Sequence, residues 1–176
     1  MMVSTKGRYA LIVCLDLAQQ DPEAYISLRE VAQRQNISMK YLESIVAMLN
    51  RAGLVRSLRG KGGGYRLTRP PESCSVGEIL QLTEGSMAPV YCLEPGGACE
   101  KSERCITYPM WRQLDQLIDS YLRRVSLADL LQGRLPQDLP CPPAKDRSSG
   151  NNGLQVRRIE AWQNQVTPLR HFQGAE

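Results

Sequence analysis

The chain has 176 residues, a net charge of +4 and a hydrophobic fraction of 42%. This length suits one domain or one small domain with an appendage, and the apolar fraction is enough for a core. No segment is apolar over the roughly 18 residues that a membrane span needs, and the N-terminus has no secretory signal. We therefore expect a cytoplasmic protein with no membrane partner.

The charge is distributed unevenly along the chain. Residues 1–72 carry eleven Lys and Arg against six Asp and Glu, whereas residues 73–133 carry five against eight. A basic segment joined to an acidic one is typical of a nucleic-acid-binding module attached to a second part. Residues 134–176 contain several prolines and a Ser-Ser-Gly-Asn-Asn-Gly run without apolar periodicity, which predicts a disordered tail.

The N-terminal part predicts a helix-turn-helix. A nearly continuous apolar run over residues 5–18 predicts a buried helix. The spacing of a capping box then predicts a short helix over residues 28–35. After a tight turn, Ser38 caps a longer helix over residues 39–51 that carries its apolar side chains on one face. Two short helices joined by such a turn form a helix-turn-helix.

A glycine-rich hairpin follows the second of these helices. Residues 54–58 and 65–67 predict strands, and Arg59, Gly60 and Lys61 lie between them, followed by three further glycines. Glycines permit tight turning and close backbone approach, and the cations neutralise phosphate. A phosphate-cradling loop is the alternative, but the strand–loop–helix order with Gly-Lys-Ser/Thr is absent from the sequence. The pattern therefore favours a wing that lies along DNA.

Residues 73–133 predict a loop between helices. Ser75 begins a second capping box and a helix that ends by Glu84, and a long loop with glycines and cysteines follows. Residues 110–125 predict a long amphipathic helix with a narrow apolar seam, which favours a dimer contact over packing within its own domain. Ser126 caps a last short helix. The seam consists of Trp111, Leu114, Ile118, Tyr121 and Val125.

Three cysteines in this loop predict an iron–sulfur cluster. Cys92, Cys99 and Cys105 are separated by six and five residues, and structural zinc sites more often pair cysteines two to four residues apart. Iron–sulfur clusters take thiolate ligands, with nitrogen or oxygen sometimes substituting. Three cysteines leave one position for another ligand, and three free thiols remain the alternative. By contrast, Cys14 and Cys74 predict small core or helix-end residues.

Four motifs together resemble one known family. Residues 4–10, 37–43 and 53–65, and the cysteine loop followed by Trp111, are similar to winged-helix transcription regulators of the IscR, NsrR and CymR type. The resemblance covers about residues 2–133. It implies a mainly α-helical fold with a small β-wing, with a winged-helix DNA-binding domain over residues 1–72. A cluster-binding loop and a long dimerisation helix then occupy residues 73–133.

The resemblance also implies which residues contact a double-stranded DNA operator. Ser38, Lys40, Tyr41 and Glu43 would face the major groove, and Arg59 would reach into the minor groove. These roles fit the physics, because recognition helices contact bases with their N-terminal residues and a narrow minor groove attracts Arg. Glu also accepts from the cytosine amino group. Tyr41 has an alternative place in the core. The regulator would bind its operator as a homodimer.

Two positions depart from the pattern of the family. Members with a [2Fe–2S] cluster have a histidine three residues after the last cysteine, where this chain has Tyr108. Members that use an acidic residue near the N-terminus differ as well, since this region has Lys6, Gly7 and Arg8. We favour a [2Fe–2S] cluster and leave a [4Fe–4S] cluster open. Candidates for the fourth ligand are Tyr108, Glu94, Glu100, Glu103, a small molecule or a partner residue.

The leading hypothesis is a transcription regulator, acting as a repressor, that senses iron–sulfur cluster status, iron, or redox or nitrosative stress. One alternative is a cluster-free thiol sensor whose cysteines form disulfides on oxidation. Another is a CymR-like regulator controlled by a partner protein. An enzyme is not expected, because the sequence has no nucleophile–base pair or nucleotide loop and its one histidine, His171, lies in the tail.

Overall fold

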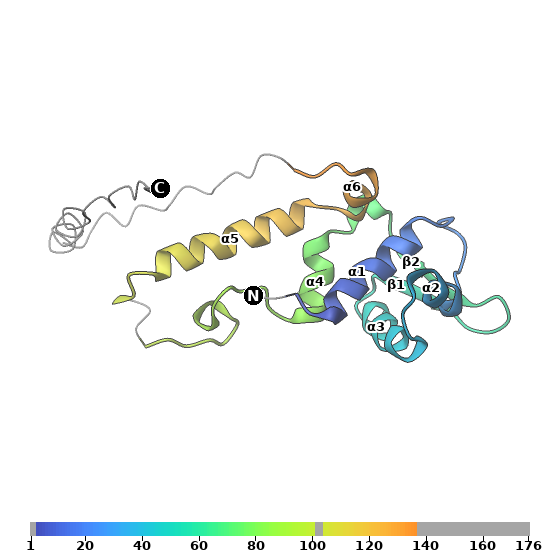
Figure 1. The fold of residues 1–176 in the computed structure, drawn as a ribbon, viewed down its shortest axis with the longest axis horizontal. Coiled ribbons are helices and arrows are strands. Elements are labelled where there is room, and N and C mark those ends of the chain that lie inside the picture. The colour runs from blue at the N-terminus through green and yellow to red at the C-terminus, as the bar shows by residue number, and fades with distance from the viewer. Residues whose placement is uncertain (1–2, 101–103, 137–176) are drawn as a thin grey trace, which may run out of the picture. The chain divides into compact units, whose positions relative to one another are not determined.

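The computed structural model describes residues 3–100 and 104–136. Within these ranges six α-helices, short 3-10 turns and one two-stranded sheet follow one another (Figure 1). The mainly helical fold with a small β-wing is therefore confirmed, while residues 137–176 of the predicted tail, with Cys141 and His171, lie outside the described residues. The elements are α1 (Thr5–Ala18), α2 (Leu28–Gln35), α3 (Met39–Arg51), β1 (Val55–Leu58), β2 (Gly64–Leu67), η1 (Pro71–Ser73), α4 (Val76–Glu84), η2 (Tyr91–Leu93), α5 (Tyr108–Arg124) and α6 (Leu127–Gln132).

Serine caps fix where most of the helices begin. In five helices the hydroxyl of the capping serine accepts a hydrogen bond from the backbone N–H three residues later, which satisfies one of the unpaired amides of the first turn. The box predicted at Ser75 is only half formed, because the Glu78 carboxylate forms an ion pair with Arg69 instead of reaching back. The capping serines are Ser4, Ser27, Ser38, Ser75 and Ser126.

The core forms around α1, which packs against α3, α4, α6 and β2. Residues from both predicted parts of the chain share this core, since Cys74, Ile79 and Leu127 join the apolar faces of α1 and α3 in one buried cluster. The described residues 81–100 and 104–124 contribute no buried residue at all. None of the described helices combines the length and the apolar character required to cross a bilayer.

A tight turn connects α3 to the wing. Gly53 has a φ of +74°, its N–H donates to the Asn50 carbonyl over 3.0 Å, and the Leu54 N–H donates to the Leu49 carbonyl over 3.0 Å. These two bonds form a Schellman motif, which satisfies the last carbonyls of the helix and directs the chain into β1. The strands then pair antiparallel from Val55–Leu67 to Leu58–Gly64.

A buried ion pair that sequence analysis missed joins α1 to α2. The Asp16 side chain is 2% exposed and accepts from Arg34 Nη2 and Nε over 2.6 and 3.0 Å and from Gln35 Nε2 over 2.7 Å. Burial raises the pKa of Asp16, but the hydrogen bonds from Arg34 and Gln35 outweigh it and hold the pKa below its ordinary value. This contact fixes the first helix of the helix-turn-helix on the core.

Candidate DNA interface and cysteine loop

The first turn of α3 presents the predicted recognition residues. The Ser38 hydroxyl caps the helix by accepting from the Tyr41 N–H over 3.4 Å. Lys40 and Glu43 are exposed, whereas Leu42 between them is fully buried. The amphipathic helix therefore buries one face in the body and leaves Ser38, Lys40 and Glu43 at the surface, where groove contacts require them.

Tyr41 has a different environment from its neighbours. Its side chain is half-buried, and its ring meets the ring of Tyr9 edge to face, with centroids 5.7 Å apart and an interplanar angle of 79°. This arrangement is the favourable one for two aromatic rings. The contact supports the core alternative for the Tyr41 ring, and its contact with DNA stays a prediction.

The tip of the wing carries two free cations. Arg59, Gly60 and Lys61 are all exposed, and neither Arg59 nor Lys61 forms an ion pair within the described part of the chain. Gly60 has a φ of +100°, and a Cβ on Gly63 would lie 2.3 Å from the Leu58 carbonyl oxygen. Only glycine suits these two positions, so the tip is narrow and its cations project beyond it.

A groove of about 560 Å³ separates the wing from the helices. Ser27 at the start of α2 lines it, together with Arg51 at the end of α3 and Arg59 of the wing. The groove therefore has basic side chains on both walls. Cations on two walls suit a phosphate backbone, which carries one negative charge for about every 1.7 Å of duplex.

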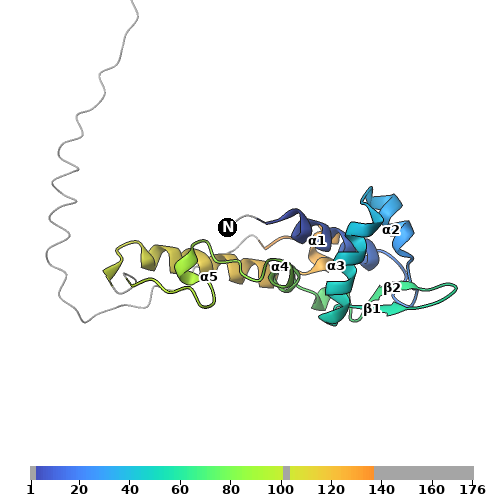
Figure 2. The same cartoon turned by 90° about the horizontal axis from the view of Figure 1, so that it is seen from below.

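The cysteine loop lies at the opposite end of the described body from the wing tip (Figures 1 and 2). Cys92 lies in η2 and is half-buried, Cys99 is exposed, and Cys105 is half-buried just before α5. The loop is folded locally by a turn in which the Gly97 N–H donates to the Glu94 carbonyl over 2.8 Å. All three thiols are thus accessible to solvent or to a ligand.

Cys105 is the loop cysteine whose pKa is lowered by its neighbours. Its Sγ atom lies 3.3 Å from the Thr107 hydroxyl oxygen. Hydrogen bonds from the Thr107 hydroxyl, the Thr107 N–H and the Tyr108 N–H lower the pKa of Cys105, and burial opposes them weakly. The thiolate is the form that binds metals and reacts as a nucleophile.

The donor chemistry of the loop fits an iron–sulfur cluster, because clusters take cysteine thiolates as ligands. The three thiols are not brought together on one centre, since residues 3–100 and 104–136 contain no group of three His, Cys, Asp or Glu placed to hold a metal ion. Among the candidates for a fourth ligand, Tyr108 is half-buried at the start of α5. Glu94 and Glu100 are exposed, and Glu103 lies outside the described residues.

The remaining described cysteines are core residues, as the sequence predicts. Cys14 is 1% exposed and Cys74 is 0% exposed. Burial raises the pKa of Cys14 to about 12, with smaller contributions from Cys74 and Glu78, and burial also raises the pKa of Cys74. Neither thiol is accessible to a cluster or to a small oxidant.

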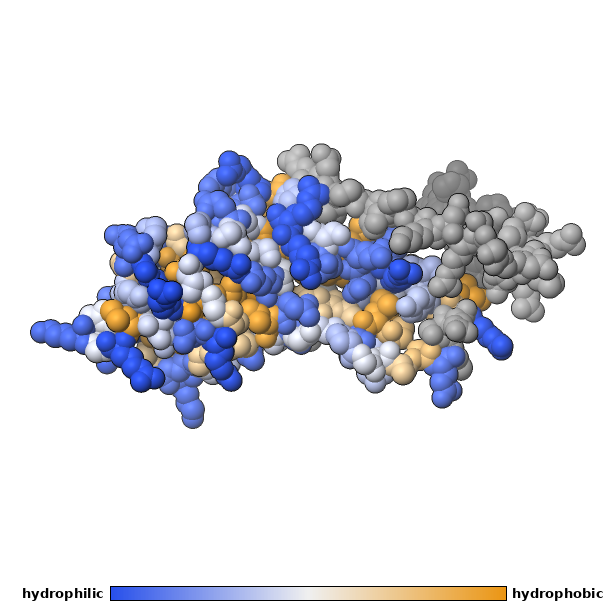
Figure 3. Space-filling model, turned by 180° about the vertical axis from the view of Figure 1, so that it is seen from behind, coloured by the Kyte–Doolittle hydropathy of each residue, from blue (hydrophilic) through white to orange (hydrophobic). Residues whose placement is uncertain are grey.

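The apolar seam of α5 divides into two halves. Val125 is 2% exposed and forms a small cluster with Val76 and Leu80, against which Tyr121 also packs. This half therefore packs within its own domain, which was the alternative to a dimer contact. Towards the start of the helix Leu114 remains 37% exposed. Figure 3 shows apolar side chains at the surface toward the end that holds α5 and the cysteine loop.

Comparison with known proteins identifies the family. The chain matches the Rrf2 family, described as iron-dependent transcriptional regulators, over residues 3–133. It is 39% identical over 154 residues to the HTH-type transcriptional regulator IscR of Aliivibrio salmonicida, and the match covers 88% of this chain and 90% of that protein.

Two solved structures have a similar fold. CymR (YrzC), the global cysteine regulator of B. subtilis, superposes with a TM-score of 0.63 at 36% identity, over 76% of this chain and 98% of that one. T. potens IscR superposes with a TM-score of 0.59 at 34% identity, over 78% and 94%. The chain therefore belongs to the Rrf2 family of winged-helix transcriptional regulators, which are not enzymes.

Proposed function

We propose that this regulator represses transcription by binding a duplex operator as a homodimer, and that it senses iron–sulfur cluster status, iron, or redox or nitrosative stress in the cytoplasm. The sensor is a cluster held by Cys92, Cys99 and Cys105. The observation that carries the proposal is the placement of three accessible thiols on one loop, while the remaining described cysteines are buried in the core. Accessible, ionisable thiols in such a loop are suited to a labile ligand site.

The DNA-binding surface in this proposal combines the first turn of α3 with the wing. Ser38, Lys40 and Glu43 read base edges in the major groove, with Tyr41 beside them, and Arg59 enters the minor groove. Gly60 and Lys61 lie along the phosphate backbone. The exposure of these residues other than Tyr41 and the basic groove between α3 and the wing support this assignment.

The sensor in this proposal forms when the loop closes on one centre. The cluster, when bound, responds to iron supply and oxidants by changing its redox state or by being lost. The hydrogen bonds of Thr107 lower the pKa of Cys105, which makes its thiolate easier to form, while the glycines around Cys99 permit the loop to fold back. We favour a [2Fe–2S] cluster, with [4Fe–4S] as the alternative, because the chain supplies three cysteines and IscR is among its relatives.

The homodimer in this proposal uses the first half of α5. Residues 81–100 and 104–124 contain no buried residue, yet α5 carries the apolar side chains of Met110, Trp111, Leu114 and Ile118. Burying apolar area against a second copy would stabilise a helix that its own body leaves uncovered. A two-fold dimer would then read two half-sites related by the same symmetry.

A second candidate is a regulator without a cluster. It is favoured by the absence of a metal-binding group among the described residues and by the similarity to CymR, whose name describes a cysteine regulator. In this version an oxidant such as peroxide takes two electrons from two loop thiols, which join as a disulfide. Control of DNA binding by a partner protein is the other form of this candidate.

One experiment separates the candidates. The full chain is purified without oxygen, and its visible absorbance, iron and acid-labile sulfide are measured. The cluster regulator is coloured and contains iron and sulfide in equal amounts, whereas a colourless protein without iron would contradict the cluster proposal and leave the thiol sensor. Salt-dependent binding of the isolated protein to duplex DNA separates direct regulation from control by a partner.

A further inference from the structure

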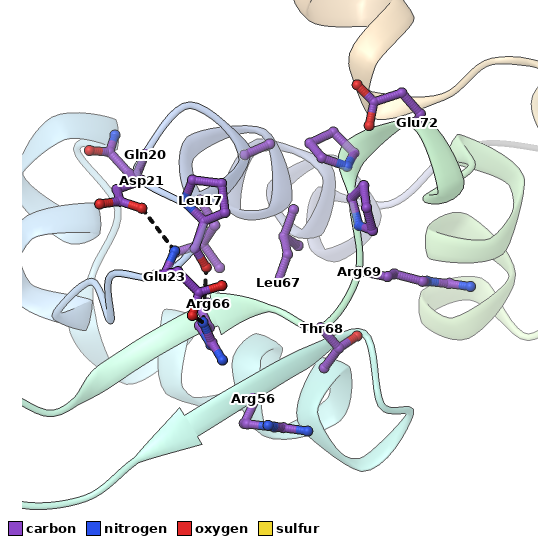
Figure 4. Close-up of a pocket in the computed structure, with 14 residues that line it drawn as sticks. Leu17, Gln20, Asp21, Glu23, Arg56, Arg66, Leu67, Thr68, Arg69 and Glu72 are labelled. Atoms are coloured by element: carbon purple, nitrogen blue, oxygen red, sulfur yellow. Dashed lines mark hydrogen bonds and ion pairs between the residues drawn. The ribbon is translucent and has the colours of Figure 1, made fainter.

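A second cavity, which we call the wing-base cavity, lies where the hairpin joins the body. It has a volume of about 450 Å³ and is bounded by the end of α1, the loop over residues 20–23, both strands and η1 (Figure 4). Pockets that hold small molecules typically measure about 300–1,000 Å³. None of its lining residues belongs to the predicted DNA contacts or to the cysteine loop.

Three arginines line this cavity: Arg69 pairs with Glu78, and the other two come from adjacent strands. Arg56 of β1 and Arg66 of β2 are cross-strand partners, so their side chains leave the same face of the hairpin. Like charges placed directly opposite each other destabilise a strand pair unless an anion lies close to them. The structure supplies one such anion, because the Glu23 carboxylate accepts from Arg66 Nη1 over 2.6 Å.

The second guanidinium remains without a counterion. Arg66 also donates to the Pro22 carbonyl and lies over the Tyr25 ring at 5.0 Å from its centroid, so these contacts hold its side chain in place. Arg56 forms no ion pair or hydrogen bond within the described part of the chain, and Figure 4 shows no contact from it to the other lining residues. A planar guanidinium fork of this kind matches a carboxylate, which it binds through two parallel hydrogen bonds.

The rest of the lining defines what the anion is attached to. Leu17 and Leu67 also line the cavity, and so do three prolines, Pro22, Pro70 and Pro71. Three carboxylates line the cavity as well: Glu72 lies at the opposite edge from Arg56, Glu23 already occupies one side of Arg66, and Asp21 lies on the same loop as Glu23. These carboxylates repel ligands with several negative charges, so a single charge and a compact apolar body fit best.

We propose that the wing-base cavity binds a small organic monocarboxylate. The carboxylate of the ligand is held by Arg56 and approached by Arg66, and its apolar body packs against the apolar residues that line the cavity. Such a ligand bridges β1, β2 and the loop after α1, and would serve as an effector of the regulator. The proposal does not depend on the cluster or on the DNA contacts.

The test is a titration of the ¹⁵N-labelled full chain with benzoate, followed by the backbone amide shifts of residues 66–69 and 72, since residues 70 and 71 are prolines without an N–H. We expect saturable shifts with a dissociation constant on the order of 1 mM. Arg56→Ala should weaken binding roughly tenfold or more, as the loss of a charge-assisted hydrogen-bond pair does. Arg56→Lys, which keeps the charge but not the fork, should weaken it by less. Arg29→Ala, an exposed arginine outside the cavity, should leave it unchanged.

Three outcomes would overturn the proposal. They are an absence of saturable shifts with benzoate, equal binding by wild type and Arg56→Ala, and equal binding of neutral benzyl alcohol. Inorganic phosphate that binds as tightly as benzoate would also contradict it, because the apolar lining residues would then contribute nothing. Arg56 is exposed, so its substitution should not affect folding, and thermal unfolding of each variant checks this.

Discussion

Cysteines have opposite environments in the packed body and in the cysteine loop. Cys14 and Cys74 lie in the core, where burial raises the pKa of both thiols. Cys92, Cys99 and Cys105 lie on a segment that buries nothing, and hydrogen bonds lower the pKa of Cys105. A buried thiol with a raised pKa stays protonated and packs as a small apolar side chain. An accessible thiol that ionises more easily is suited to binding a metal or to redox chemistry.

The two regions also differ in what holds them in place. The body has a contiguous core and the Asp16–Arg34 ion pair. Residues 81–100 and 104–124 have no buried side chain, and local turns, helix hydrogen bonds, partial packing and polar contacts such as the Ser4–Glu84 hydrogen bond stabilise them. Segments with few buried contacts open at low free-energy cost and are the usual elements of switches. The loop and the first half of α5 therefore suit a part completed by a cluster and a second subunit.

The largest expected effect is loss of the cluster from loop variants. Cys92→Ala, Cys99→Ala and Cys105→Ala should each abolish visible absorbance, because two thiolates cannot easily hold a cluster that already lacks a fourth cysteine. Cys14→Ala and Cys74→Ala should keep the wild-type spectrum, since both thiols are buried away from the loop. Anaerobic absorbance with iron analysis provides the measurement. An intact cluster in any of the loop variants would break the distinction between the regions.

Tyr108→Phe extends this series to the fourth ligand. We expect an unchanged spectrum, because a phenol is a poorer ligand for a cluster than a thiolate. Loss of the cluster in this variant would instead identify Tyr108 as a ligand. The comparison with the cysteine variants then shows whether the chain or another molecule completes the site.

The next effect concerns assembly. Leu114→Glu or Ile118→Glu should convert the dimer to monomers, because each places a charge in an interface that desolvates it. Gln116→Glu adds the same charge at an exposed position about 200° around the helix from Leu114, and should remain dimeric. Sedimentation velocity measures the three variants at one protein concentration. A dimer in both apolar-face variants would mean that α5 is not the interface.

Local signals explain why the helices could be predicted so closely. The predicted bounds of α1, α2 and α3 agree with the structure, because capping serines and turns lie within a few residues of the ends they determine. The wing tip could also be predicted from the sequence, since its glycines and cations are close together in the chain. Predictions that depended on distant partners succeeded less often.

Partners far along the chain account for the differences. Asp16 is one acid in an apolar run of the sequence, and its partners Arg34 and Gln35 follow 18 and 19 residues later. Helical periodicity placed Val125 on the apolar seam, but it could not indicate that Val76 and Leu80 cover that residue. The convergence of the three loop thiols is also nonlocal, and it remains a prediction.

A moderate effect is expected at the wing tip. Arg59→Ala should weaken binding to the cognate operator by about 1–3 kcal/mol, as the loss of a groove-inserted arginine does. Arg56→Ala removes the same charge from the base of the same hairpin and should have a smaller effect. Fluorescence anisotropy at one fixed salt concentration measures both. Equal losses would indicate general attraction by the hairpin charge, and an unchanged affinity in Arg59→Ala would remove that residue from the interface.

The smallest expected effect is on the free energy of unfolding, compared between a core thiol and a loop thiol. Cys14→Ser places a hydroxyl in a site that is 1% exposed and apolar, and should lower the free energy of unfolding by about 1–3 kcal/mol. Cys92→Ser makes the same chemical change on the half-buried loop and should change it by less than about 0.5 kcal/mol in the iron-free protein.

Urea unfolding of the reduced, iron-free protein at one concentration measures both serine variants, because the slope reports whether the unfolded states remain comparable. A fixed concentration is necessary since the proposed dimer would contribute to apparent stability. If the loop thiol proved as costly to replace as Cys14, the loop would have to be packed in the iron-free protein. The loop would then be ordered without a ligand, and a cluster or disulfide would modify an existing structure and not create it.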